Sequence, residues 1–502
     1  MAVALHATSR LNLRKEIKMR HVQIILGPPG TGKTTSLLRI VEGALSRGVL
    51  PERIAYLAFT RKAANEAKER AMAQFGFDEQ RFPYFRTLHS LAFKELALKR
   101  NEVMGNADYR KLGKALGVEF KGIYDENLGM HTGPGLGDKC SRIESLARVT
   151  LRGLEEQHNL SHTNDLTLHA VKQYDASLRK YKHENGLLDF TDMLERYDSA
   201  LPVDVCIFDE AQDLSSLQYK MAIRAASEAS EVYIAGDDDQ AIFGWAGADV
   251  NKFLSLKGDV VVLPQSYRVP RSVHKVALGI LDRIKHRYTK PWSPKIELGS
   301  VEHIADEGQI NFDSEGTWMC LARSKYMLNR FRKVARQQGF SYSYNGEHSL
   351  ETQETRAIMT WERVRSGKRV SLYEAKNMKQ FLPFTVTLKK QEDYGVEDFT
   401  LSTGSGDWMK VLRGIAPEER EYLRSCLRND QKFHDKPRIS ISTIHQSKGG
   451  EADNVVLLTD VGKLSYENSH TDEENRVWYV AATRARENLF VVQPRSLRHY
   501  SL

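Results

Sequence analysis

Gly27-Pro28-Pro29-Gly30-Thr31-Gly32-Lys33-Thr34 matches the pattern G-x-x-x-x-G-K-[ST] of a phosphate-binding loop. Residues 21–26 before it are typical of a short buried parallel strand, and residues 35–45 after it have the apolar spacing of a helix. Glycines let consecutive backbone N–H groups converge on a phosphate, and the helix N-terminus adds a positive dipole end. We expect Lys33 to reach the β- and γ-phosphates and Thr34 to hold Mg²⁺. The alternative is a Gly/Pro turn with a surface lysine, but the flanking strand and helix favour a nucleoside triphosphate site.

The composition is that of a large globular chain without a membrane segment. Its 502 residues, 41% hydrophobic and 27% charged, suffice for about three or four domain-sized units. No apolar run approaches the roughly 20 residues of a membrane span, and residues 1–20 lack the apolar core of a secretory signal. The net charge of +8 is compatible with a polyanionic partner.

The four cysteines bear on metal binding and on the redox compartment. They are scattered without C-x-x-C spacing, which argues against a zinc module, an Fe–S cluster or a disulfide framework. Such usage predicts a reducing, cytoplasmic location, inside a host cell if the protein is viral. The cysteines are Cys140, Cys206, Cys320 and Cys426.

Short apolar runs recur between longer helical stretches, which is the signature of parallel α/β sheets. The runs lie at residues 53–59, 203–208, 231–236, 259–263, 317–322, 438–444, 454–459 and 488–492. They are numerous enough for two sheets. Mainly polar, helix-like segments at 97–185 and 350–436 interrupt them, and we interpret both as insertions into α/β domains. Residues 290–308, which begin with a proline-containing stretch, are predicted to be irregular.

A second motif, Asp209-Glu210-Ala211-Gln212-Asp213, directly follows the apolar run at 203–208. The carboxyl ends of parallel strands are where an α/β sheet places its ligand crevice. We expect Asp209 to complete the Mg²⁺ shell and Glu210 to orient and deprotonate the attacking water. A solvated strand end is the alternative, and the phosphate loop in the same chain weighs against it.

Beyond these two motifs, residues 236–249 read GDDDQAIFGWAGAD. Phosphate loop, DEAQD and this block, in that order, resemble the superfamily 1A DNA helicases of the UvrD/Rep/PcrA type. Further blocks that match are AFTRKAA at 58–64, RTLHS at 86–90, LDFTDM at 188–193, QSYR at 265–268, TIHQSKGGE at 443–451 and YVAATRAR at 479–486. One block would be weak evidence, but so many in one order are specific.

The resemblance implies two RecA-like parallel-sheet domains of the P-loop type, with ATP and Mg²⁺ between them and one mainly helical insertion in each. The implied boundaries are 1–96 with 186–275 for the first domain, 97–185 for its insertion, 276–349 with 437–502 for the second domain, and 350–436 for its small insertion.

The resemblance also assigns roles around the nucleotide. Gln240 resembles the family's γ-phosphate sensor, and Arg268 and Arg484 resemble two arginines that reach the γ-phosphate from across the cleft. Tyr267 is expected to stack on adenine and Glu451 to contact the ribose, although either is alternatively structural. The implied nucleotide-binding residues are Gly27, Pro28, Pro29, Gly30, Thr31, Gly32, Lys33, Thr34, Thr35, Tyr267, Arg268, Glu451 and Arg484.

Other matching residues correspond to the family's DNA groove. Phe59, Phe243 and Trp245 match positions where rings stack on bases, which needs no particular base sequence. Candidate contacts to the DNA backbone are Thr60, Arg61, Thr87, His89, Thr443 and His445. Core aromatics and ordinary polar residues are the alternatives.

Several positions depart from the family pattern. Leu11-Asn12 is not followed by the usual adenine-reading glutamine, so we expect relaxed base selectivity. Ala246 and Gly450 stand where Arg and Leu are usual, and the second insertion is shorter than in large bacterial members. The last motif lies close to Leu502, so we expect no fused C-terminal nuclease. The compact size resembles phage or accessory members.

We therefore expect an ATP-dependent DNA helicase or translocase that acts in replication, repair or recombination. The resemblance implies movement in the 3′→5′ direction. The expected partners are single-stranded and tailed duplex DNA together with replication or repair proteins, without a membrane, and a monomer would suffice. The alternatives are a translocase that displaces proteins with little unwinding, a non-catalytic ATP-switched DNA-binding protein, and RNA as the track.

Overall fold

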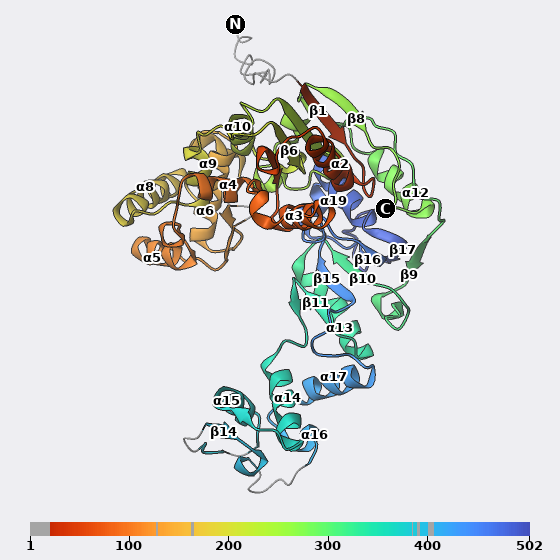
Figure 1. Cartoon of the computed structure of the whole chain (residues 1–502). Helices are drawn as coiled ribbons and strands as arrows, with labels where there is room; N and C mark the ends of the chain where they lie inside the picture. The colour runs from red at the N-terminus through yellow and green to blue at the C-terminus, as the bar shows by residue number, and fades with distance from the viewer. Residues whose placement is uncertain (1–20, 127–128, 162–164, 384, 389–391, 400–405) are drawn as a thin grey trace. The chain divides into compact units, whose positions relative to one another are not determined.

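The computed structural model describes residues 21–502 apart from 127–128, 162–164, 384, 389–391 and 400–405. The chain divides into two compact units, whose elements can be followed by colour in Figure 1. The first unit holds the residues up to Val269 with Ile280–Lys295 and Thr471–Tyr479. The second unit holds Pro270–Gly279, Ile296–His470 and Val480–Leu502. Two of the points at which the chain passes from one unit to the other lie inside helices, namely α12 (Arg271–Leu281) and α19 (Asp472–Ala482).

The first unit is built on a six-stranded parallel sheet with the order β3-β2-β6-β7-β1-β8. Its strands are β1 (His21–Leu26), β2 (Ile54–Ala58), β3 (Phe85–Thr87), β6 (Val205–Asp209), β7 (Glu231–Gly236) and β8 (Asp259–Val262). Leu26 pairs with Gly236, and Ala58 pairs with Asp209. The strand ends that carry sequence motifs therefore lie along one edge of the sheet.

Both faces of the inner strands of this sheet are covered, which explains why these strands are nearly continuous apolar runs. Ile25 of β1 lies in one core with Leu37 and Leu38 of α2 (Lys33–Ser46). Its neighbour Ile24 lies in the opposite core with Ile143 of α6 (Leu136–Val149). The helices that follow or cover the strands are α2 (Lys33–Ser46), α3 (Arg61–Phe75), α4 (Leu88–Glu95), α9 (Phe190–Arg196), α10 (Ser216–Ala225) and α11 (Val250–Leu254).

The first insertion is helical and shares the second of these cores. Its elements are α5 (Asn106–Leu116), β4 (Tyr124–Asp125), β5 (Met130–His131), α6 (Leu136–Val149), α7 (Leu154–Leu160) and α8 (Leu168–Asn185). A glycine-rich stretch folds around the fully buried Asp138. Its Oδ2 accepts from the backbone N–H groups of Lys121, Gly122 and Gly135 at 2.9, 3.1 and 2.9 Å. The glycines are needed because a Cβ on Gly133 would lie 2.2 Å from that oxygen.

The second unit contains a seven-stranded sheet with the order β12-β11-β15-β10-β16-β17-β9, in which only the β11–β12 pair is antiparallel. Its strands are β9 (Ser300–Ile304), β10 (Trp318–Ala322), β11 (Tyr342–Tyr344), β12 (Glu347–His348), β15 (Ile439–Thr443), β16 (Ala452–Leu458) and β17 (Ala485–Val492). Helices α13 (Asn329–Gln338) and α18 (Lys463–Glu467) belong to the same unit.

The second insertion is a small subdomain whose buried apolar residues continue the core of the seven-stranded sheet. It consists of α14 (Gln353–Arg365), β13 (Val370–Ser371), α15 (Leu372–Lys379), β14 (Asp393–Tyr394), α16 (Trp408–Val411) and α17 (Pro417–Arg428). The fully buried Trp361 of α14 anchors it, and its indole N–H donates to the Gly406 carbonyl at 3.0 Å.

The two parallel sheets confirm the predicted fold class, and each predicted apolar run coincides with an observed strand. The prediction that residues 290–308 are irregular is wrong at Ser300–Ile304, which form β9. This strand lies at the sheet edge and buries none of its residues fully, so it lacks the apolar run of an inner strand. Within the described residues, none of the helices has the length and apolarity needed to span a bilayer.

Candidate nucleotide site and nucleic-acid interface

The loop after β1 forms a cradle of backbone groups. Gly30 and Gly32 adopt φ values of 74° and 77°, which favour glycine, and Thr31 donates from both its N–H and its hydroxyl to the Pro28 carbonyl. Helix α2 starts at Lys33 without a side-chain cap on its first amides. A helix start of this kind leaves N–H groups to bind an anion, so the loop suits a phosphate group.

The Lys33 side chain lies across the loop. Its Nζ donates to the Gly27 carbonyl at 3.1 Å and lies 3.5 Å from Oε1 of Glu210. A Cβ on Gly27 would lie 2.2 Å from Cγ of Lys33, so this path requires glycine. Thr34 is partly buried beside it, whereas the Thr35 hydroxyl accepts from Arg70 of α3 at 2.9 Å.

The acidic pair lies at the end of β6, as predicted from the strand. Asp209 is buried, and its carboxylate accepts from the Tyr56 hydroxyl at 2.7 Å and from the Glu210 N–H at 2.9 Å. Burial and the neighbouring charge of Glu210 raise the pKa of Asp209 to about 6. Glu210 itself has a left-handed φ of 55°, which is uncommon for a residue with a Cβ and marks strained backbone at this site.

The residues present fit a magnesium ion. Thr34, Asp209 and Glu210 offer hard oxygen donors, which Mg²⁺ prefers. Burial and the charge of Glu210 both disfavour the ionised form of Asp209, so a cation beside its carboxylate would be stabilising. A divalent cation brought in with a nucleotide would fill this role.

The QSYR motif docks directly on the phosphate loop within the first unit. The Ser266 hydroxyl donates to the Pro29 carbonyl at 2.8 Å, and the Tyr267 N–H donates to the Gly30 carbonyl at 2.8 Å. A Cβ on Gly30 would lie 2.3 Å from Cβ of Arg268. The Tyr267 ring is 76% exposed, as a platform for a planar ligand requires. Two predicted nucleotide residues thus lie beside the loop.

The predicted sensor Gln240 ends a short 3₁₀ helix (Asp238–Gln240) after β7. Its Nε2 donates to Oδ2 of Asp237 at 2.8 Å. Gln212 connects this group to the acidic pair, because its Oε1 accepts from the Asp237 N–H at 3.0 Å and its Nε2 donates to Glu210 at 2.6 Å. The chain Glu210–Gln212–Asp237–Gln240 therefore brings the predicted base and the predicted sensor into one network.

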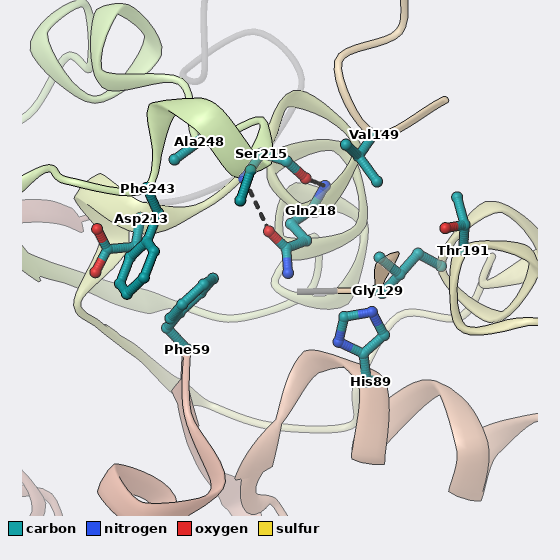
Figure 2. A pocket seen from close by; sticks show the side chains of 12 residues that line it. Phe59, His89, Gly129, Val149, Thr191, Asp213, Ser215, Gln218, Phe243 and Ala248 are labelled. Atoms are coloured by element: carbon teal, nitrogen blue, oxygen red, sulfur yellow. Dashed lines mark hydrogen bonds between the residues drawn. The ribbon is translucent and has the colours of Figure 1, made fainter. Parts of the chain in front are cut away.

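Phe59 and Phe243 face each other beside a narrow pocket in the first unit (Figure 2). Their ring centroids lie 5.6 Å apart at an interplanar angle of 32°. His89 lines the same pocket, and burial, with a smaller contribution from Arg61, lowers the pKa of His89 to about 4. Its imidazole is therefore neutral at neutral pH and offers hydrogen bonding rather than charge. Trp245 is 40% exposed, and its backbone N–H donates to Oε1 of Glu473 at 3.1 Å.

The predicted backbone contacts have local roles in the fold. Thr60 and Thr87 cap α3 and α4 by accepting from Ala63 N–H and Ser90 N–H, both at 3.2 Å. Arg61 pairs with Glu126 at 2.6 Å. Their contact with a nucleic acid stays a prediction.

The remaining predicted residues lie in the second unit. Arg484 is 1% exposed and donates to the carbonyls of Val480 and Gly450 at 2.9 and 3.0 Å. Glu451 is exposed, 3.7 Å from Arg486. Thr443 ends β15 with its hydroxyl 3.1 Å from Gln446, and the partly buried His445 follows it.

Sequence reasoning missed three residues that support the site, Tyr56, Gln212 and Ser266. Gln212 and Ser266 lie inside motifs that were recognised, so motif membership was a signal for them. Tyr56 carries no such signal, since it is one apolar-run residue of β2 among others. Leu11-Asn12, where the adenine-reading glutamine was sought, lies outside the described residues.

A parallel sheet that enters a phosphate loop from one strand and carries an acidic pair on another defines a P-loop nucleotide-binding protein. The chain belongs, more narrowly, to the UvrD-like helicase family. The model of the UvrD/REP helicase N-terminal domain matches residues 12–261, and that of the UvrD-like helicase C-terminal domain matches residues 158–496.

Three relatives illustrate the similarity. The ATP-dependent DNA helicase srs2 of Schizosaccharomyces pombe is 27% identical over 54% of this chain and 34% of its own length. The ATP-dependent DNA helicase Rep of Buchnera aphidicola is 23% identical over 62% of this chain and 51% of its own. The ATP-dependent DNA helicase PcrA of Bacillus subtilis is 26% identical over 57% of this chain and 41% of its own. The chain thus spans about a third to a half of the length of these relatives.

Proposed function

We propose that the protein is an ATP-dependent motor that moves on single-stranded DNA and unwinds duplex DNA. One observation carries the proposal most directly: Ser266 and Tyr267 bind the phosphate loop through the Pro29 and Gly30 carbonyls. A phosphate loop alone serves many nucleotide-binding proteins. Arg268 and the exposed Tyr267, which the same motif places beside the loop, match the residues that the resemblance to this helicase family predicts there.

In this proposal each residue around the loop has a separate role in ATP hydrolysis. The loop amides and Lys33 hold the β- and γ-phosphates, and Glu210 takes a proton from the attacking water. Arg268 stabilises charge on the transferring phosphoryl group, and Tyr267 stacks on the base. Thr34 and Asp209 would hold Mg²⁺, which neutralises phosphate charge when bound. The roles of Thr35, Arg484 and Glu451 remain predictions from the resemblance.

For the track we propose single-stranded DNA bound over Phe59, Phe243 and Trp245. The exposed Trp245 and the facing pair of phenylalanines offer ring surfaces, and stacking on such a ring contributes about 1–3 kcal/mol per base. The relatives are named as DNA helicases, which favours DNA over RNA. The 3′→5′ direction, the replication or repair partners and an intracellular place of action are proposed on the same family basis. The domain boundaries stated from the sequence stay part of this proposal.

Phosphate release in the presence and absence of single-stranded oligodeoxythymidylate tests the enzyme. We expect DNA to stimulate ATP hydrolysis, Lys33→Ala to abolish it, and Glu210→Gln to lower kcat on the order of 10²–10⁴-fold. Glu228→Gln, an exposed carboxylate away from the site, is the matched control and should keep the wild-type rate. Wild-type turnover in Glu210→Gln would refute the assigned base. Equal stimulation by oligouridylate would refute DNA as the preferred track.

A translocase that strips proteins from single strands is the second candidate function. The small second insertion, with α14 and α17 as its longest helices, favours it because the large bacterial members are expected to carry more there. Strand displacement and protein displacement measured side by side on the same tailed substrate separate the two. A translocase would release a DNA-bound protein while leaving the duplex annealed.

A further inference from the structure

Three consecutive aspartates lie buried beside the sensor. Asp237, Asp238 and Asp239 have no exposed surface, and carboxylate oxygens from all three lie within 4.8 Å of one another. Buried carboxylates at such spacing repel each other and require a cation or protons. The compensating charge therefore decides the shape of the segment that carries Gln240.

Lys290 supplies that charge from within the same unit. Its Nζ lies 3.0 Å from Oδ1 of Asp237, 2.7 Å from Oδ1 of Asp238 and 2.7 Å from Oδ2 of Asp239. Its side chain is 1% exposed. Although burial alone would lower the pKa of Lys290, the three carboxylates raise it above the usual value. The ammonium group thus occupies the position a metal ion would take among these oxygens.

Two further groups from the same segment complete the arrangement. Arg287 donates from Nε and Nη2 to the two oxygens of Asp239, each at 2.7 Å. The Tyr288 N–H donates to Oδ2 of Asp238 at 2.8 Å. The segment from Arg287 to Lys290, here called the aspartate clasp, thereby binds all three carboxylates.

The clasp reaches the sensor through Asp237. One oxygen of this carboxylate faces Lys290, and the other accepts from Nε2 of Gln240 at 2.8 Å. Removing Lys290 would free the Asp237 side chain to rotate or to take up a proton. Either change would weaken the hydrogen bond by which Asp237 orients the Gln240 amide.

The two residues directly before the clasp contact a helix that also reaches the proposed DNA track. Asp472 of α19 accepts from the N–H groups of Lys285 and His286 at 2.9 and 2.7 Å. The next residue of the helix, Glu473, accepts a hydrogen bond from the backbone N–H of Trp245 at 3.1 Å. A continuous set of contacts within the first unit therefore joins Trp245 to Gln240.

We propose that Lys290 and Arg287 are positioning residues that hold Gln240 in place and couple DNA binding to ATP hydrolysis. The coupling part of this inference rests on the proposed function. The sensor role of Gln240 is itself a prediction from the family resemblance, and the new element is the clasp that orients it. Lys290 acts through Asp237 and is not a catalytic residue.

The kinetic test uses the full chain with Lys290→Met, Lys290→Arg and the exposed control Lys257→Met. We expect Lys290→Met to lose DNA-stimulated kcat on the order of 10- to 100-fold with little change in the KM for ATP, as expected when a reacting group is misplaced. Lys290→Arg should restore part of the stimulation, and Lys257→Met should match the wild type. Adding Lys290→Met to Gln240→Ala should cause no further loss, because both changes remove the same interaction. Retained stimulation in Lys290→Met, or additive losses, would overturn the proposal.

A second measurement, which needs no ATP turnover, tests whether Lys290 occupies the position among the three carboxylates. Lys290→Ala leaves three carboxylates around an open position, so it should bind one Mn²⁺ more than the wild type in a titration followed by electron paramagnetic resonance. That Mn²⁺ should raise the melting temperature of Lys290→Ala more than that of the wild type. Equal binding by both proteins would show that Lys290 does not fill the position. Should the Lys290 variants fail to fold, Arg287→Gln replaces Lys290→Met in the kinetic comparison. A wild type without DNA stimulation would refute the proposed function, and the Mn²⁺ result would still decide the clasp.

Discussion

Gly30 shows how one missing side chain shapes the nucleotide site. A methyl group there would meet Cβ of Arg268 at 2.3 Å and the Ser266 hydroxyl at 2.8 Å. We expect Gly30→Ala to displace the QSYR segment and to abolish ATP binding, measured with a fluorescent nucleotide. Gly48 is the matched control, because its φ is 87° and no atom lies within 4 Å of an added Cβ. Gly48→Ala costs about 1–2 kcal/mol of backbone strain but should bind ATP normally. Equal binding by both variants would show that the close approach does not matter.

The pKa of Asp209 gives a pH prediction at the same scale. Below about pH 6 the carboxyl becomes protonated, so Mg²⁺-dependent binding of an ATP analogue should weaken as the pH falls through that value. The charge of Glu210 contributes to the raised pKa, so Glu210→Gln should move the midpoint of this loss to a lower pH. Binding titrations between about pH 5 and 8 measure the midpoint. An unchanged midpoint in Glu210→Gln would contradict the coupling of the two carboxyls, and Glu228→Gln should leave it unchanged.

At the level of elements, a buried ion cluster joins α6 to α9. Arg148 of α6 contacts Glu144 at 3.1 Å, Asp189 at 2.9 Å, Asp192 at 2.6 Å and Glu195 at 2.7 Å. Removing one partner of a buried ion pair leaves uncompensated charge and costs about 3–5 kcal/mol. We expect Arg148→Met to lower the free energy of unfolding by about that amount in urea denaturation.

The matched control for Arg148 lies on α8. Arg179 pairs with Asp175 one helical turn away, at 2.8 Å, and its side chain is 67% exposed. Arg179→Met should cost less than about 1 kcal/mol. Because Thr191 and Leu194 of α9 line the pocket beside Phe59, Arg148→Met should also weaken DNA affinity. A loss in Arg148→Met no larger than in Arg179→Met would mean that the cluster does not hold the two helices together.

The elements that could be predicted from the sequence are those whose pattern is local. Inner parallel strands such as β7 are continuous apolar runs, and the phosphate loop has its own spacing, so both are visible without a structure. Edge strand β9 is not, because its partly exposed residues follow no such run. The contacts of Ser266 with Pro29 and of Lys290 with Asp237 join residues far apart in the chain. They depend on tertiary packing, which a single sequence does not reveal.

For the whole molecule, the proposed function is directed movement on DNA driven by ATP hydrolysis. The proposed stacking of bases on Phe59, Phe243 and Trp245 does not depend on base identity, so these rings alone set no direction. Membership of the UvrD-like helicase family supplies the expectation of 3′→5′ movement. We therefore expect a duplex with a 3′ single-stranded tail to be unwound and its 5′-tailed counterpart to remain annealed, measured by release of a labelled strand.

Two controls make this last prediction decisive. Glu210→Gln should bind the tailed duplex yet release no strand, because hydrolysis rather than binding supplies the work. Phe243→Ala should lose about 1–3 kcal/mol of single-strand binding free energy and should unwind poorly. It should keep ATP binding, because Phe243 belongs to the aromatic pair with Phe59 and lies outside the phosphate loop. Unwinding of the 5′-tailed duplex alone would contradict the direction implied by the family. Unwinding by Glu210→Gln at the wild-type rate would contradict the motor itself, because strand release would then need no ATP hydrolysis.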